Sequence, residues 1–341
     1  MSIMKSQELN PNRNFPKNSN GVKKWTFVLP TAPHPDTLVA IFIFKKFGEK
    51  LYPGIKEAGF EFWQELPKNK TTESLEKENY ILIDIGGGKF DHHNKKEKTT
   101  TSLLVAEHLG VIGAPALAKM LEYARRDDFF GKGTISEDPI DRAFGLSALI
   151  YHLNKSLVKS PERVVEIVMP LLIAHYNEEY RRAEELPLEF KSKTEKGESE
   201  TFDVKQKGKK LKVVMIKSDN PSLTGYLRSI TGGKFDVVLQ QQSTGHMNIL
   251  TRPAKRIDLR SFVSLVRLRE AERQNSNLEM SASDLSLPGR LPGIKEWYYD
   301  RATNSLQNGG LNPKEIPPTK ISWNEMKKLL ELGLSEQIIS F

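Results

Sequence analysis

The chain of 341 residues contains no cysteine. Disulfide bonds, thiolate metal sites and cysteine nucleophiles are therefore excluded, and a bound metal must use oxygen and nitrogen ligands. The chain also lacks a run of about eighteen apolar residues, so we expect no membrane-spanning helix. The opening residues, MSIMKSQELNPNRNF, contain no apolar segment typical of a secretory signal, and we expect a cytoplasmic protein.

Charged residues make up 28% of the chain and the net charge is +8, which suits an anionic substrate. A chain of this length predicts two domains. Residues 1–23 are polar and are expected to form a disordered leader. The charged stretch 191–200 marks the expected boundary between a first domain, 24–190, and a smaller α/β domain, 200–275. Residues 276–341 are then expected to be a linker and a C-terminal extension.

The most informative stretch is Tyr80–Asn94, which reads YILIDIGGGKFDHHN. Its first six residues are apolar and β-branched apart from one Asp, a pattern typical of a strand buried on both faces. The strand leads through Asp84 into three glycines and then into Asp91-His92-His93. Carboxylates and imidazoles together suit Mn, Zn or Fe better than Ca, which prefers oxygen ligands. This stretch therefore predicts a metal site.

The order of elements predicts the fold class. A strand, a helix, two further strands and a series of helices indicate an α/β domain with a doubly wound, mostly parallel sheet. Beyond the charged stretch, shorter strands and helices indicate the smaller α/β domain. The strands expected in the first domain are 25–29, 60–63 and 80–85, and its helices are 38–47, 101–109, 114–126, 139–153 and 161–185.

Further candidate ligands follow the other elements of the first domain. In open α/β sheets, ligands gather outside the carboxyl ends of the strands. The first strand runs into His34-Pro35-Asp36, and a helix ends at Asp127-Asp128. The donors are numerous enough for two divalent ions. The candidate metal ligands are His34, Asp36, Asp84, Asp91, His92, and Asp127 or Asp128.

These motifs occur in the order found in the DHH phosphoesterase superfamily, which the chain resembles over residues 25–150. The His-x-Asp and Asp-x-Gly-Gly motifs look most like the melanocyte-proliferating-gene branch, whose members are linked to exonuclease activity on RNA. The resemblance implies a metal-dependent phosphodiester hydrolase acting on short oligonucleotides or other nucleotidic phosphodiesters. It also implies Mn²⁺, with Mg²⁺ as a substitute. That branch has an acid directly after the Asp, whereas this chain has Thr37, which leaves the count at two ions or one.

Two-metal chemistry then implies a role for each residue. Asp84 would bridge the ions, with His34, Asp36 and one of the aspartates at 127 and 128 on one side. Asp91 and His92 would hold the other side. A bridging water would attack phosphorus in line, while His93 would orient ligands or protonate the leaving oxygen. The catalytic residues implied are Asp91, His92 and His93.

The turn Gln240–His246 in the smaller domain loosely resembles the glycine-rich turn with which the family grips substrate phosphate. Nearby arginines offer bidentate contacts to phosphate oxygens. For Arg267 and Arg269, an ordinary solvated helix charge is an equal alternative. The predicted substrate-binding residues are Thr244, Gly245, His246, Arg252 and Arg269.

Two alternative functions stay open at this point. One is a pyrophosphatase-like phosphoanhydride hydrolase. The other is a catalytically degenerate member that binds nucleotide or RNA without cutting it, to which Thr37 points. The expected partner is a nucleotide or a short single-stranded nucleic acid, and the sequence leaves a monomer or a homodimer open.

Overall fold

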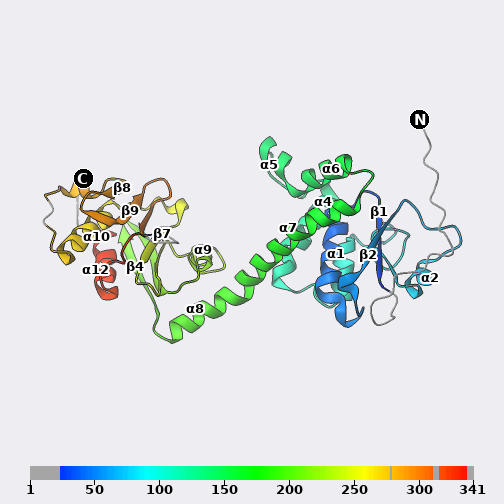
Figure 1. Ribbon diagram of the computed structural model, residues 1–341, viewed down its shortest axis with the longest axis horizontal. Helices are drawn as coiled ribbons and strands as arrows, with labels where there is room; N and C mark the ends of the chain where they lie inside the picture. Colours follow the sequence, from blue (N-terminus) through cyan, green and yellow to red (C-terminus); the bar gives the residue numbers. More distant parts are fainter. Residues whose placement is uncertain (1–23, 277–278, 310–314, 336–341) are drawn as a thin grey trace. The chain divides into compact units, whose positions relative to one another are not determined.

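The computed structural model of the protein describes residues 24–276, 279–309 and 315–335. The chain divides into two compact units, Met1–Ala183 and Glu184–Phe341, which we call unit 1 and unit 2 (Figure 1). The boundary lies earlier than the expected stretch 191–200, because helix α8 (Leu186–Glu195) packs against elements of unit 2. The expected leader, residues 1–23, lies outside the described residues.

Unit 1 is built on a parallel sheet with the strand order β2-β1-β3. The strands are β1 (Thr26–Pro30), β2 (Gly59–Trp63) and β3 (Tyr80–Leu82). The central strand carries Phe27, Val28 and Leu29, which are all fully buried. Such a continuous apolar run is expected where both faces of a parallel sheet are covered.

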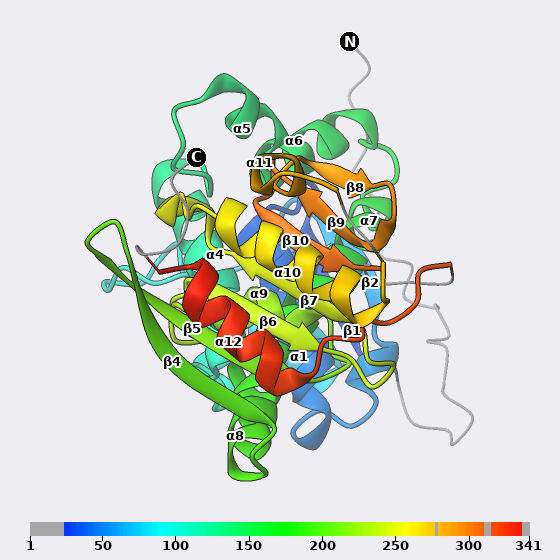
Figure 2. The same cartoon turned by 90° about the vertical axis from the view of Figure 1, so that its left-hand side faces the viewer.

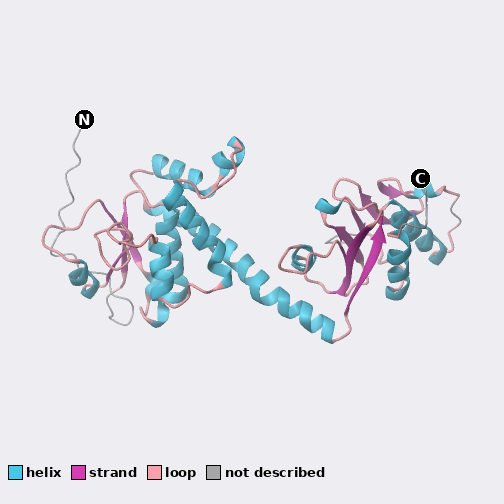
Figure 3. Ribbon diagram, turned by 180° about the vertical axis from the view of Figure 1, so that it is seen from behind, coloured by secondary structure: helices cyan, strands magenta, loops and turns pink. Residues whose placement is uncertain are grey.

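Helices cover both faces of this sheet. Phe27 and Leu29 pack with the helices that follow β1 and β3, whereas Val28 packs on the other side with Leu75. The helices of unit 1 are α1 (Pro35–Phe47), α2 (Thr72–Lys77), α3 (Thr101–His108), α4 (Ala118–Phe130), α5 (Pro139–Phe144), α6 (Leu146–Ser156) and α7 (Glu162–Tyr180). Figure 3 shows how helices dominate this unit.

Unit 2 contains a sheet of seven strands in the order β4-β5-β6-β7-β10-β9-β8. Only β5 and β6 pair in parallel, and the other neighbours are antiparallel. The strands are β4 (Ser199–Gln206), β5 (Lys209–Lys217), β6 (Val237–Gln241), β7 (Met247–Thr251), β8 (Gly289–Leu291), β9 (Ile294–Asp300) and β10 (Ser305–Asn308). The residues expected to be a C-terminal extension therefore complete the sheet.

The helices of unit 2 lie on both faces of its sheet. Helices α10 and α12 pack on each other and share one apolar core with the sheet, while α8 and α9 share a core on the opposite face (Figure 2). A capping box formed by Ser322 and Glu325 fixes the start of the last of these helices. The helices not yet bounded are α9 (Ser222–Arg228), α10 (Arg260–Arg273), α11 (Ala282–Leu285) and α12 (Trp323–Gly333).

The fold class is thus α/β in two units, but parallel pairing is less extensive than expected. Within the part of the chain that the structure describes, parallel pairing occurs in the three strands of unit 1 and in one pair of unit 2. Long-range antiparallel pairing in unit 2 accounts for the difference. Among the described residues, no helix is both long enough and apolar enough to cross a membrane.

Candidate metal centre

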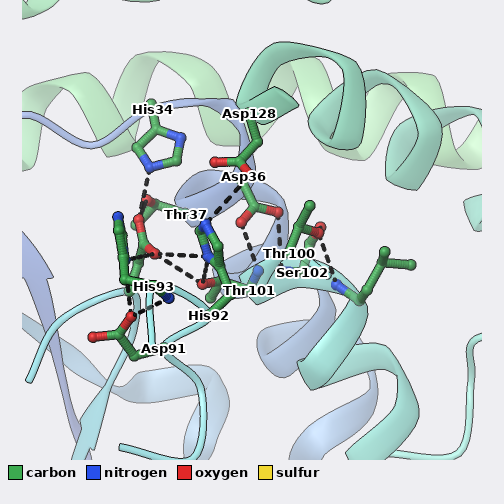
Figure 4. Close-up of polar contacts among 12 residues, drawn as sticks. His34, Asp36, Thr37, Asp91, His92, His93, Thr100, Thr101, Ser102 and Asp128 are labelled. Carbon is green, nitrogen blue, oxygen red and sulfur yellow. Dashed lines mark hydrogen bonds and ion pairs between the residues drawn. The ribbon is translucent and has the colours of Figure 1, made fainter. Parts of the chain in front are cut away.

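Two neighbouring strands of unit 1 deliver the first two polar side chains of the centre. His34 stands at the start of α1, directly after the loop from β1, and Asp84 follows β3. Since β1 and β3 are parallel neighbours, their carboxyl ends meet at one edge of the sheet. His34, labelled in Figure 4, donates from its Nε2 to Asp84 Oδ2 at 2.7 Å. The two motifs, fifty residues apart in sequence, are in direct contact.

The backbone turns sharply where β3 ends. Asp84 has a φ of +59°, and Gly86 and Gly87 have φ values of +84° and +71°. This left-handed region suits glycine and is tolerated by aspartate, so the sequence Asp-Ile-Gly-Gly matches the path of the chain. The turn brings Phe90 back toward the strand, where its carbonyl accepts from the Asp84 amide at 2.9 Å.

Asp91 holds this loop together. Its Oδ2 accepts from the amide of Gly87 at 2.7 Å, and its Oδ1 accepts from the amide of His93 at 3.0 Å and from His93 Nδ1 at 2.8 Å. Burial opposes ionisation, but the hydrogen bonds from the Gly87 and His93 amides hold the pKa of Asp91 below its usual range. Asp91 therefore lies beside the candidate metal groups and braces them.

The first turn of α3 orients two carboxylates, a contribution that the sequence motifs did not reveal. The fully buried Asp36 accepts from the amides of Thr101 at 2.7 Å and Ser102 at 3.0 Å. A helix N-terminus stabilises a carboxylate through its free amides and its dipole. Thr101 Oγ1 also donates to Asp84 Oδ1 at 3.0 Å. One turn of helix thus fixes both Asp36 and Asp84.

His92 lies between two groups of donors. Its Nδ1 is 3.2 Å from Asp84 Oδ1, and its Nε2 is 3.3 Å from Asp128 Oδ2. Its ring stacks on that of His93, with centroids 4.5 Å apart. Among the described residues, two groups have donor atoms within 4.8 Å of one another and are able to hold a metal ion. These groups are Asp84 with His92 and His93, and Asp36 with His92 and Asp128.

The structure separates the two neighbouring aspartates at the end of α4. Asp128 belongs to the second group, whereas Asp127 lines an adjacent groove. Successive residues of a helix point about 100° apart, so only one of the pair faces the centre. The structure places Asp128 there.

The centre concentrates negative charge in a buried place. Burial, together with the charges of Asp36 and Asp84, raises the pKa of Asp128. Burial alone would lower the pKa of His34, but its hydrogen bond to Asp84 raises it. The hydrogen bond to Asp91 likewise raises the pKa of His93. Crowded carboxylates beside imidazoles form a donor set that fits a divalent cation.

Thr37 occupies the position where the resemblance expects an acid. It is fully buried, and its Oγ1 donates to Asp84 Oδ2 at 3.4 Å. The hydroxyl therefore supports Asp84, and neither candidate group includes residue 37.

The predicted phosphate turn of unit 2 is engaged within its own unit. Thr244, Gly245 and His246 connect β6 and β7, and His246 is 5% exposed. His246 Nε2 lies 2.8 Å from the carbonyl oxygen of Ile316, to which it donates, and Nδ1 accepts from Thr244 Oγ1 at 2.9 Å. Nε2 thus ties the turn to the segment before α12 and Nδ1 bonds within the turn, which leaves neither nitrogen free for phosphate in this arrangement.

The predicted phosphate-binding arginines also have partners within the chain. Arg252 Nη2 lies 2.9 Å from the buried carboxylate of Asp236, which needs a positive partner. Arg269 pairs with Glu272 on the exposed side of α10. Arg267 is fully buried and donates to backbone carbonyls, so it is a structural residue. The alternative of an ordinary solvated charge therefore fits Arg269 but is wrong for Arg267.

Comparisons with known proteins leave the centre to be interpreted from its own residues. No family model matches the chain, and no curated protein matches it. A solved structure of an uncharacterized protein from Helicobacter pylori G27 aligns with 91% of this chain and 99% of that chain at 11% sequence identity. The TM-score is 0.23, so this likeness carries no argument about fold or activity.

Proposed function

We propose that the protein is a metal-dependent phosphodiester hydrolase acting on short oligonucleotides or other nucleotidic phosphodiesters. The observation that supports this most directly is the convergence of motifs from four separate stretches of unit 1 on one buried centre. We further propose that the three parallel strands and the helices on their two faces form the core of a doubly wound layer. The motifs that carry the resemblance to the DHH phosphoesterases are the ones that meet.

In this proposal His92 and the carboxylates of Asp36, Asp84 and Asp128 would hold Mn²⁺ or Mg²⁺, as one ion or two, while His93 stays free to transfer a proton. Bound divalent ions supply Lewis-acid stabilisation of the phosphoryl charge and activate water. The chain's own residues orient the donors: Thr101 and Thr37 hold Asp84, and the amides of α3 hold Asp36.

His93 is the residue of the centre best placed to reach a substrate, since its side chain is 63% exposed. Asp91 fixes its ring through Nδ1. Hydrolysis consumes one water, whose oxygen bonds to phosphorus while the ester P–O bond breaks and the leaving oxygen takes a proton. An imidazole with a raised pKa is suited to give that proton.

A second candidate function is nucleotide or RNA binding without cleavage, which Thr37 favours because it replaces an acidic ligand position by a hydroxyl. A screen with Mn²⁺ over inorganic pyrophosphate, cyclic dinucleotides and short RNA separates the alternatives. We expect the wild type to turn over nucleotidic phosphodiesters and Asp84→Asn to lose this activity, because the substitution removes a carboxylate of the centre. Asn is the suitable replacement because it tolerates the left-handed backbone at this position. His175→Ala, at an exposed position of α7, is the matched control.

Three outcomes count against hydrolysis of phosphodiesters. Turnover of pyrophosphate alone favours the phosphoanhydride hydrolase, and RNA binding without turnover favours the binding protein. Full activity of Asp84→Asn means that the centre described above does not carry the reaction.

A further inference from the structure

Two hollows of unit 1 adjoin at His34, beside the candidate metal centre. The smaller has a volume of about 420 Å³ and is lined by Trp63, Asp84 and His93 among others. The larger has a volume of about 960 Å³ and extends from His34 and Asp127 along helices α5 and α6. His34 lines both hollows, so a ligand that passes the centre has room on either side.

The smaller hollow offers an aromatic surface beside the centre. Trp63 is the last residue of β2, the third strand whose carboxyl end reaches this edge of the sheet. Its indole Nε1 donates to Glu61 Oε2 at 3.1 Å, and its ring packs near Tyr80 with centroids 5.7 Å apart. The ring is therefore held in one orientation and stays half-buried. All four nucleobases can stack on such a ring, so this contact does not depend on the nucleotide sequence.

The larger hollow is lined by unpaired cations. Lys132, Arg142 and Lys155 are exposed along it, and none of them forms an ion pair with a carboxylate of the described residues. Lys155 Nζ lies 4.4 Å from the ring centroid of Tyr151, which is 57% exposed. Asp127 is the one acid among the residues that line this hollow within the described chain. Cations and an aromatic ring along one groove suit the phosphates and bases of a single strand.

We infer that the substrate is a single-stranded oligonucleotide that occupies both hollows. One terminal nucleotide stacks on Trp63, the scissile phosphate lies at the metal centre, and the following phosphates lie against Lys132, Arg142 and Lys155. This inference rests on the proposed function for the cleavage step, but the binding step is independent of it. A groove of this volume far exceeds the needs of pyrophosphate.

Binding without chemistry tests the groove. The parent protein for this test is the full chain carrying Asp84→Asn, which should not cleave the RNA. Fluorescence anisotropy then measures its affinity for a labelled hexameric single-stranded RNA. Adding Lys132→Ala, Arg142→Ala and Lys155→Ala should weaken binding at least ten-fold. It should also reduce the slope of log K against log salt by about 2, since each phosphate contact on a single strand contributes about 0.7.

A matched variant controls for net charge. Lys205→Ala, Lys209→Ala and Lys295→Ala remove three exposed charges from unit 2 and should leave affinity and slope unchanged. If the groove variant binds the hexamer as tightly as its parent, or loses no more than the control variant, the assignment of the groove is wrong. In the active enzyme, the groove variant should raise KM for the hexamer while leaving KM for a dinucleotide unchanged.

An abasic substrate tests Trp63 without depending on a variant that folds poorly. Removing the terminal base should lower kcat/KM of the wild type about ten-fold, and Trp63→Phe should retain most activity on the intact substrate. Trp63→Ala should then cost nothing further on the abasic substrate. An equal loss on both substrates would assign Trp63 a purely structural role.

The outcomes separate this inference from the proposed function. If turnover depends neither on the three cations of the groove nor on the terminal base, the protein is a hydrolase but the two-part substrate site is wrong. If RNA binding depends on the groove but no turnover occurs, the substrate site is supported and the proposed hydrolase activity is wrong.

Discussion

The arrangement around His92 leads to a prediction about the number of bound metal ions. His92 contributes to both donor groups, whereas Asp84 belongs to one and Asp128 to the other. Removing Asp84 or Asp128 should therefore impair one group, whereas removing His92 should impair both. Isothermal titration with Mn²⁺ should give about two ions for the wild type, about one for Asp84→Asn and for Asp128→Asn, and the weakest binding for His92→Ala.

Thermal unfolding provides a second measure of the same prediction. At a free Mn²⁺ concentration 100 times the Kd, each site adds about 2.7 kcal/mol to the free energy of unfolding. For a unit of this size, each kcal/mol raises Tm by about 2 to 4 °C. One bound ion should therefore raise the Tm of unit 1 by roughly 5 to 10 °C, and two ions by about twice as much. EDTA should reverse the shift.

A variant outside the centre serves as the control. His175→Ala removes an exposed histidine on α7 and should bind Mn²⁺ as the wild type does. If His92→Ala keeps the wild-type shift, the centre is not a metal site. If Asp84→Asn and Asp128→Asn each abolish all binding, the two groups form one site with one ion.

Three further predictions concern stability. Arg267→Leu should destabilise unit 2 by about 3 kcal/mol or more in urea unfolding, because three close backbone carbonyls lose their donor. Gly333→Ala should lower the free energy of unfolding by about 1 to 3 kcal/mol, because the added Cβ would lie 2.5 Å from a backbone atom of α10. Gly225→Ala, in open space within α9, should raise it by about 0.5 to 1 kcal/mol in the same measurement. A hydrogen bond from Arg260 lowers the pKa of Asp258 to about 2, so its stabilisation is present above about pH 4 and is lost as the pH falls toward 2. Asp258→Asn should lower Tm at pH 7 more than at pH 3.

The sequence was most informative where a candidate ligand lies close to a strand end. The apolar runs before Asp84 and before His34 identify buried strands, and parallel neighbours bring their carboxyl ends together. Local patterns of this kind are readable because they depend on a few consecutive residues. The contact between His34 and Asp84 could therefore be anticipated from the spacing of elements alone.

Contacts set by helix phase or by distant backbone could not be anticipated in this way. The choice of Asp128 over Asp127 depends on the rotation of α4. The amides that hold Asp36 come from residues 65 and 66 positions later, and backbone amides leave no trace in composition. His246 likewise donates to a carbonyl 70 residues away in sequence. The residue that was expected to bind phosphate therefore holds two segments of unit 2 together.

The extent of unit 2 was missed for a similar reason. The pairing of β10 with β7 places Ser305 opposite Leu250, across an intervening stretch that reads as a polar linker. Strands of three or four residues, such as β8 and β10, give a weak periodic signal. Sheet order is decided by pairing between distant segments, so the sequence showed the strands without showing that they complete one sheet.

The substitution at residue 37 weakens the resemblance less than the sequence alone suggested. The hydroxyl of Thr37 lies in the centre and donates to Asp84, so it restrains a candidate ligand instead of supplying one. The group of Asp36, His92 and Asp128 is complete without it. A buried acid at residue 37 would add a further negative charge to a place where burial and neighbouring charges already raise the pKa of Asp128. Threonine keeps the centre closer to neutrality while leaving both groups of donors intact.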